Sequence, residues 1–90
     1  GDGVPKDYGR AFELYKQATE LGASHAYRNL AVMHLNGEGT AIDLGAAWLS
    51  YRKGVELGNE PDPELAERIE SGLTAGVRTQ VDREFSDWLR

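Results

Sequence analysis

A period of 36 residues is the feature that most constrains the fold of this 90-residue chain. Residues 1–22 align with residues 37–58 without an insertion, and nine of the 22 aligned positions are identical. The identical residues of the first copy are Gly1, Gly3, Asp7, Gly9, Ala11, Tyr15, Glu20, Leu21 and Gly22. A fixed period of this length is typical of chains built from stacked units, because one short unit cannot bury its apolar face alone.

Each copy has the pattern of one amphipathic helix. Asp7 and Asp43 precede the helical stretch, where a carboxylate accepts hydrogen bonds from free backbone amides. Gly22 and Gly58 follow it, where a left-handed residue closes the last turn. The apolar stripe is Ala11, Leu14, Tyr15, Ala18 and Leu21 in the first copy, and Ala47, Tyr51, Gly54, Val55 and Leu57 in the second.

A further helix is predicted between the two copies, over residues 24–36. Ala26, Leu30, Met33 and His34 share one face at helical spacing. We expect Ser24 to cap the start of this helix and Gly37-Glu38-Gly39 to end it. The chain therefore alternates helices with glycine-containing turns.

The pattern changes after Gly58. Residues 59–63 predict a linker in which Asp62 caps a short helix and Pro63 is its first residue. Thr74 is expected to cap a last helix that reaches about Leu89. Its apolar positions are Val77, Val81, Phe85, Trp88 and Leu89, and Arg78, Asp82, Arg83 and Asp87 are expected on the opposite, polar side. A terminal helix with one wet face is typical of the end of a repeat array.

The charge of the chain disfavours nucleic acid as a partner. The net charge is −5, and residues 59–90 contain eight acidic residues against four arginines. An acidic surface repels phosphate groups. No apolar run approaches the roughly 20 residues that a membrane span needs, so membrane insertion is not expected either.

The stretch from Ala26 to Gly58 resembles a Sel-one-like repeat (SLR), a relative of the tetratricopeptide repeat. The matching positions are Ala26, Leu30, Ala31, His34, Gly37, Gly39, Asp43, Ala47, Gly54 and Gly58, and residues 1–7 match the loop of the same family. The resemblance implies an all-α fold, an α/α solenoid of Sel-one-like or tetratricopeptide-like helical hairpins with a C-terminal capping helix. The family usually has Gly, Tyr and Val where this chain has Ala31, His34 and Thr40.

We expect a single domain over residues 1–90. Residues 1–22 would be the loop and second helix of a truncated repeat, and residues 24–58 a complete repeat. Residues 62–73 would be the first helix of a degenerate repeat, and residues 74–90 the C-terminal capping helix. The N-terminal helix would then lack its usual neighbour, so we expect the C-terminal part of a longer array, with self-association through the free face as one outcome.

No residue pattern points to catalysis, a cofactor or a metal. The Gly-x-Gly loops have neither the preceding strand of a dinucleotide site nor the Gly-Lys-Ser/Thr of a phosphate loop. His25 and His34 are nine residues apart and no further ligands converge on them in the sequence. The chain has no cysteine, and no nucleophile–base pair stands out. We therefore expect a protein that is not an enzyme.

The resemblance to tetratricopeptide-like arrays places the first helix of each hairpin on a concave surface. The residues of this helix expected outside the core are His25, Arg28, Asn29, Val32 and Asn36. Such residues can bind an extended peptide or a partner helix, with Arg28 clamping a carboxylate, or they can simply be solvated. Phe12 and Trp48, which recur at one aligned position, are expected to pack between repeats.

The function that the resemblance implies is a non-catalytic scaffold for protein–protein interaction. Its partner would be a protein or peptide, in bacterial signalling, envelope or host-interaction complexes. The alternatives are a β-lactam-binding or hydrolase-like domain and a purely structural terminal cap. The family resemblance alone favours a periplasmic or secreted location.

Overall fold

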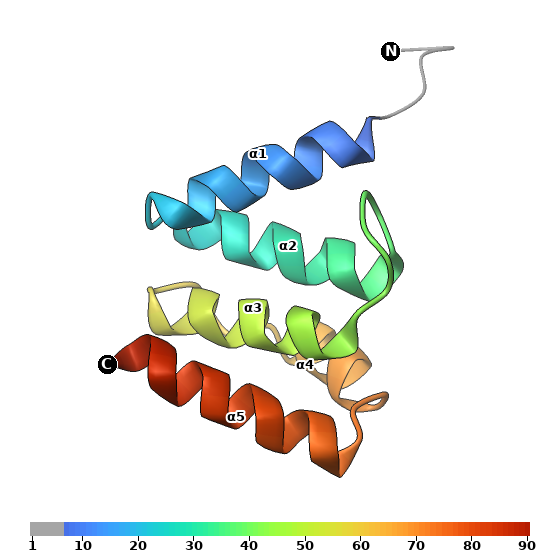
Figure 1. Ribbon diagram of the computed structural model, residues 1–90, viewed down its shortest axis with the longest axis vertical. Coiled ribbons are helices and arrows are strands. Elements are labelled where there is room, and N and C mark those ends of the chain that lie inside the picture. Colours follow the sequence, from blue (N-terminus) through green and yellow to red (C-terminus); the bar gives the residue numbers. More distant parts are fainter. Residues whose placement is uncertain (1–6) are drawn as a thin grey trace.

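The computed structural model describes residues 7–90, which form five α-helices and no β-strand (Figure 1). The helices are α1 (Tyr8–Glu20), α2 (Ser24–Asn36), α3 (Leu44–Glu56), α4 (Pro63–Glu70) and α5 (Ala75–Leu89). The predicted loop over residues 1–6 lies outside the described residues. The predicted all-α solenoid class is confirmed.

Side chains cap four of the five helices at the predicted residues. Asp7 accepts a hydrogen bond from the Arg10 amide at 2.9 Å, and Asp43 accepts one from Ala46 at 3.0 Å. Asp62 caps α4 and Thr74 caps α5 in the same way. These bonds satisfy backbone amides that have no partner inside a helix, so they fix where each helix begins.

The start of α2 differs from the prediction. Its N-cap is Ala23, whose carbonyl accepts a bond from the Ala26 amide, and no side chain caps this end. Ser24 lies inside the helix, and its own carbonyl accepts a hydrogen bond from the Asn59 side chain at 2.7 Å. The prediction of Ser24 as the cap was therefore wrong by one residue.

The C-terminal helices also deviate in their bounds. The helix expected over residues 62–73 ends at Glu70, because the chain turns through Ser71 and Gly72, whose amides bond to Glu67 and Ile69. Leu73 lies beyond the helix yet still packs against the core. The helix expected over residues 74–90 spans Ala75–Leu89.

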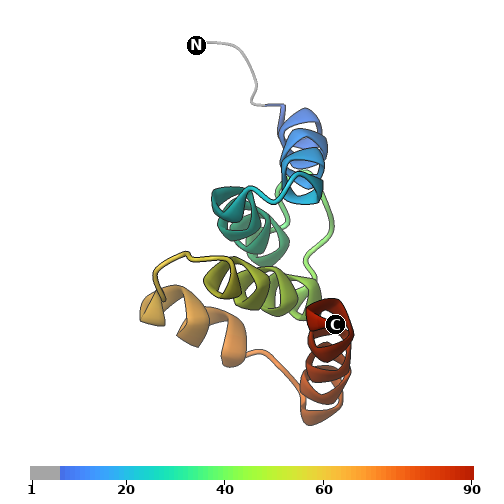
Figure 2. The ribbon, with the colours of Figure 1, turned by 90° about the vertical axis from the view of Figure 1, so that its left-hand side faces the viewer.

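The helices stack in two layers around α3. In Figure 2, α2 and α4 lie to one side of α3, while α1 and α5 lie toward the other. The central core cluster joins α2, α3 and α4 through Ala31, Ala47, Leu65 and Ile69. Two of these four residues are alanines, whose small side chains let helix axes approach closely. Trp48 and Tyr51 stack at 5.4 Å and pack against this cluster, as expected for the recurrent aromatic position.

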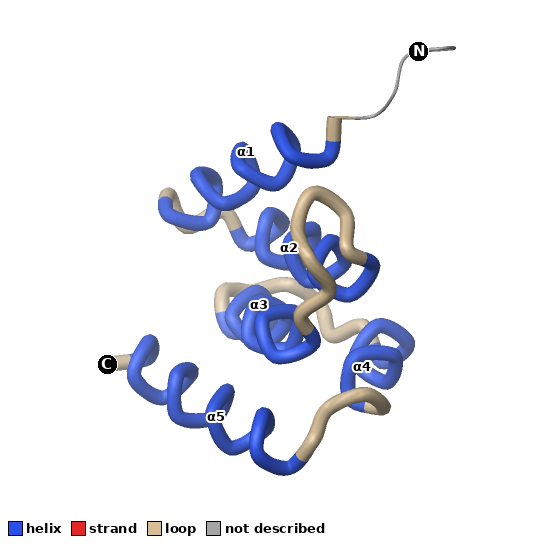
Figure 3. The backbone as a smooth tube through the Cα atoms, turned by 45° about the vertical axis from the view of Figure 1, so that its right-hand side comes forward, coloured by secondary structure: helices blue, strands red, loops and turns tan. Residues whose placement is uncertain are grey.

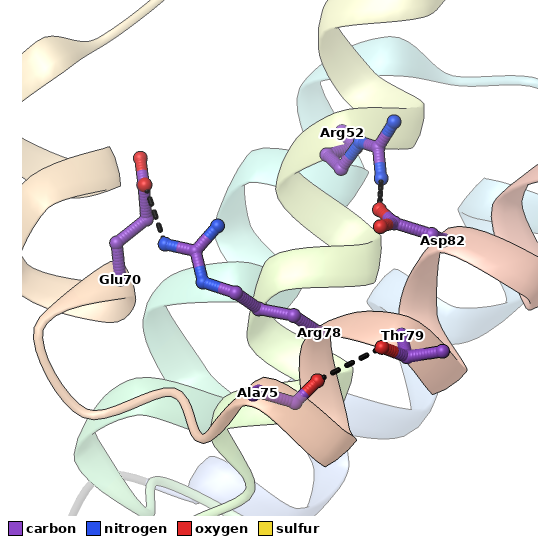
Figure 4. A network of polar contacts seen from close by, with 6 residues as sticks. All are labelled: Arg52, Glu70, Ala75, Arg78, Thr79 and Asp82. Carbon is purple, nitrogen blue, oxygen red and sulfur yellow. Dashed lines mark hydrogen bonds and ion pairs between the residues drawn. The ribbon is translucent and has the colours of Figure 1, made fainter.

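The last helix packs against α3 through Val81 and Phe85, both buried. The tube in Figure 3 shows α5 and α4 diverging on two sides of α3. Figure 4 shows Arg78 of α5 reaching Glu70 of α4, and Asp82 of α5 bonded to Arg52 of α3. Arg78 and Asp82 thus form ion pairs with neighbouring helices while their side chains stay partly exposed.

The turn after α2 lies against the start of α1. Gly39 has a φ of +75°, and a Cβ atom at this position would overlap the carbonyl of Tyr8. The backbones of two successive units therefore meet at this point, and a glycine is the residue that permits the contact.

Candidate protein-binding surface

A shallow depression of about 200 Å³ separates α2 from α4. Its lining residues are Arg28, Val32, Asp62, Glu64, Leu65 and Arg68. We call it the α2–α4 depression. The first helices of two successive hairpins form its walls, and two of the predicted candidates, Arg28 and Val32, line it.

An ion pair crosses the upper part of this depression. The Arg28 guanidinium donates a hydrogen bond to the Asp62 carboxylate at 2.8 Å. This bond and the cap bond from the Leu65 amide hold the pKa of Asp62 below its usual value. The Asp62 amide in turn donates to the Tyr51 hydroxyl at 3.1 Å. Asp62 therefore ties α2, α3 and α4 together, and the proposed carboxylate clamp already holds a carboxylate of its own chain.

Val32 is not simply a surface residue. It is half-buried and packs against the central core cluster, which corrects its assignment outside the core. Leu65, on the opposite wall, is buried in the same cluster. The floor of the depression is therefore continuous with the core, and the charged residues lie above it.

The remaining candidates on α2 are dispersed. His25 is exposed and lines a second depression of about 420 Å³, together with Arg28, Leu57 and Glu60. The Asn29 side chain donates to the His25 carbonyl at 3.2 Å, and Asn36 is exposed at the end of the helix. Asn29 and Asn36 line neither depression. Of the five predicted residues, Arg28 and Val32 share the α2–α4 depression, and His25 and Arg28 share the second one.

The residues contributed by α4 were missed in the sequence. A shift by the repeat period of 36 carries Arg28 onto Glu64 and Val32 onto Arg68, and both of these line the depression. The same period that revealed the first two copies could therefore have indicated them. Arg68 is exposed and forms no ion pair with another described residue, although Asp62 and Glu64 line the same depression.

Two arginines and two acidic residues line the depression. Arginine binds carboxylates through two parallel hydrogen bonds, and Arg68 is available for this geometry. Among residues 7–90, no group of His, Asp and Glu is arranged to hold a metal ion. None of the described helices is long and apolar enough to cross a membrane.

A second surface of interest is the face of α1 that no helix covers. The aligned residues Leu21 and Leu57 are 89 % and 43 % exposed, and Ala47 is fully buried whereas its counterpart Ala11 is not. Leu14 is 54 % exposed. The same motif is thus less covered in α1, because α3 packs against α2, α4 and α5 while α1 packs against α2.

The repeat and the stacked hairpins agree with a comparison against protein families. The Sel1 repeat matches residues 1–22 and 24–59, which is more than half of the chain. The chain belongs to the Sel1 repeat family. No curated protein and no solved structure matches the chain significantly.

Membership of the Sel1 repeat family supports a general role. Sel1 repeats form helical solenoids that serve as scaffolds for protein–protein interaction, and they are typically non-catalytic. The two matched segments end at residue 59, so α4 and α5 lie outside them. The α2–α4 depression therefore combines one matched helix with one from the divergent C-terminal segment.

Proposed function

We propose that this Sel1 repeat chain is a non-catalytic scaffold that binds a protein or peptide in the α2–α4 depression. The observation that carries the proposal is Arg68, which lines the depression, is exposed and has no ion-pair partner among the described residues. Arg28 stands on the opposite wall. Two guanidinium groups above an apolar floor favour a peptide that presents a carboxylate beside an apolar side chain.

The carboxylate of such a peptide binds Arg68 first. Arg28 is half-exposed and bonded to Asp62, so it joins the ligand only by sharing or exchanging that internal carboxylate. An Arg28→Glu variant would place two acidic groups side by side and disturb the start of α4. Charge reversal at Arg68 tests the depression while leaving the ion pair between Arg28 and Asp62 in place.

The experiment selects peptides from a displayed random library against the wild-type chain and measures their affinity for two variants. Arg68→Glu is expected to weaken the selected peptides at least about tenfold, the loss typical of one charged contact. Arg83→Glu is the matched control, because Arg83 is an exposed arginine of α5 away from the depression. Circular dichroism of both variants checks that the helices are retained.

Two results would contradict the proposal. One is a selection that yields no peptide whose binding depends on Arg68. The other is an equal loss of affinity in Arg68→Glu and Arg83→Glu, which would indicate a general charge effect instead of a site.

We further propose that the free face of α1 packs against a helix of the same kind as α2. The internal repeat supports this, because α3 aligns with α1 one period along the chain and packs against α2. In a longer array the preceding hairpin supplies this helix, as expected for the C-terminal part of such an array. In the 90-residue chain alone, a second copy supplies it, and the chain self-associates.

We also propose a cellular context and two tests of alternative functions. Family resemblance favours bacterial signalling, envelope or host-interaction complexes, and a periplasmic or secreted location. A β-lactam-hydrolysis assay on the full-length protein tests the enzymatic alternative, and turnover would overturn the non-catalytic assignment. Deletion of residues 59–90 tests the purely structural alternative, which requires stability to fall while partner binding persists.

A further inference from the structure

His34 occupies an unusual position between α1 and α2. It lies in the last turn of α2 and makes an edge-to-face contact with Phe12 of α1, with ring centroids 5.3 Å apart. Its Nδ1 atom is buried and has no hydrogen-bond partner among the described residues. A buried polar atom without a partner is rare in folded proteins and calls for an explanation.

The charged groups around the His34 imidazole have opposite effects on its pKa. From α1, Lys16 lies over the face of the Phe12 ring, with its Nζ 5.6 Å from the centroid. From the start of α3, Asp43 attracts a positive charge, and its amide donates to the His34 carbonyl at 3.0 Å. The C-terminal end of α2 also favours a cation. Burial outweighs the attraction and lowers the pKa of His34, Asp43 raises it in part, and Lys16 lowers it further.

The helix that His34 holds is weakly attached. None of the α1 residues is buried, and α1 packs against α2 without covering from a second helix on its outer face. Segments with few buried apolar contacts open at a low free energy. A change at one contact between α1 and α2 therefore has a larger relative effect here than it would in the central core.

We propose that His34 is an acid-sensitive latch, whose protonation releases α1 from α2. A proton on Nδ1 would create a buried donor without an acceptor, beside Phe12 and near Lys16, and opening of α1 lets water reach it. The release exposes apolar surface of α2 and removes the first unit from the stack. This device is independent of the α2–α4 depression.

The direction of the pH effect follows from proton linkage. When α1 is open, His34 titrates near its ordinary value of about 6.5, and when α1 is closed it titrates lower. The open state therefore binds more protons below that pH. The stability of the closed state is fully present above about pH 6.5 and declines as the pH falls, by up to about tenfold in the opening equilibrium per pH unit between the two pKa values.

Hydrogen exchange followed by mass spectrometry tests the latch at pH 7.5 and pH 5.5, after correction for the intrinsic exchange rates. The wild-type chain is expected to lose protection over residues 8–20 at the lower pH and to keep it over residues 75–89. His34→Gln, which is neutral at both pH values, is expected to remove this difference. His25→Gln, the matched variant at the other, exposed histidine, is expected to retain it.

The titration of His34 by NMR supplies a readout that does not depend on any variant. The pKa of His34 is expected to lie below the ordinary histidine value of about 6.5. The proposal is overturned if His34 titrates at or above that value, or if α1 keeps its protection at pH 5.5. It is equally overturned if α5 loses protection together with α1, or if His34→Gln responds to acid as the wild type does.

Discussion

At the scale of single residues, the repeat is maintained by contacts between units as well as within them. Gly39 belongs to the turn after α2, but its lack of a side chain serves the start of α1, because Tyr8 occupies the space of a Cβ. Gly22 also has a positive φ, of +84°, yet nothing lies within 4 Å of its Cβ position. Gly22 is therefore required only for its left-handed backbone conformation, whereas Gly39 is required both for its conformation and for the space that a side chain would fill.

Substitution of both glycines by alanine measures these two needs. Gly22→Ala is expected to cost about 1–2 kcal/mol, the strain of an L-residue in the left-handed region. Gly39→Ala is expected to cost about 1–3 kcal/mol more, since the added methyl group must displace the backbone of α1. Urea denaturation monitored by circular dichroism gives both free energies of unfolding. Equal losses would show that the contact between Gly39 and Tyr8 has no energetic weight.

At the scale of elements, capping chemistry made the helix starts predictable. Asp7, Asp43, Asp62 and Thr74 cap the helices where the sequence indicated, because each cap is a local interaction over three residues. The start of α2 was missed by one residue, because the helix already begins at Ser24 and no side chain caps this end.

The candidate site was less predictable than the helices. The pairing of Arg28 with Asp62 joins residues 34 positions apart and depends on how α4 packs across α3. The half-burial of Val32 depends on the same packing. Periodicity groups the residues that share one face of α2, but it carries no information about what a divergent α4 brings against that face.

The cap of α5 offers a test at the element scale. Thr74→Ala removes the hydroxyl that accepts a hydrogen bond from the Val77 amide at 3.2 Å, and it is expected to cost about 1 kcal/mol. Thr74→Ser keeps the hydroxyl and is expected to be close to neutral. Chemical denaturation gives the free energy of unfolding of the two variants. A similar loss of stability in both would show that the methyl group of Thr74, and not its capping hydroxyl, stabilises the helix.

At the scale of the whole molecule, coverage is uneven along the stack. The helices α2, α4 and α5 surround α3, whereas α1 is held from one side. The described residues extend over 42 × 28 × 20 Å, an elongated shape in which α1 forms one end (Figure 1). The end units of a solenoid have a neighbouring unit on one side only. The residues of α1 are accordingly more exposed to solvent than the aligned residues of α3.

This unevenness predicts self-association of the 90-residue chain. Sedimentation velocity is expected to show a mass that rises with concentration for the wild type. The double variant Leu14→Gln/Leu21→Gln removes two exposed apolar side chains, one in α1 and one at the residue that follows it, and is expected to be monomeric. Leu89→Gln changes a comparably exposed leucine of α5 and serves as the control, which should associate like the wild type. A wild-type chain that stays monomeric at all concentrations would contradict the prediction.

The two tryptophans have a consequence for how unfolding of this chain is observed. Trp48 lies in α3 against the central core cluster, and Trp88 lies in α5, where it stacks on Phe85 and contacts Tyr27. Neither α1 nor α2 contains a tryptophan. Intrinsic fluorescence therefore reports on the packing around α3 and α5 and carries no direct signal from α1, while far-ultraviolet ellipticity reports on all five helices. A denaturation curve in which ellipticity declines before fluorescence would be the optical signature of a molecule that unravels from its N-terminal end.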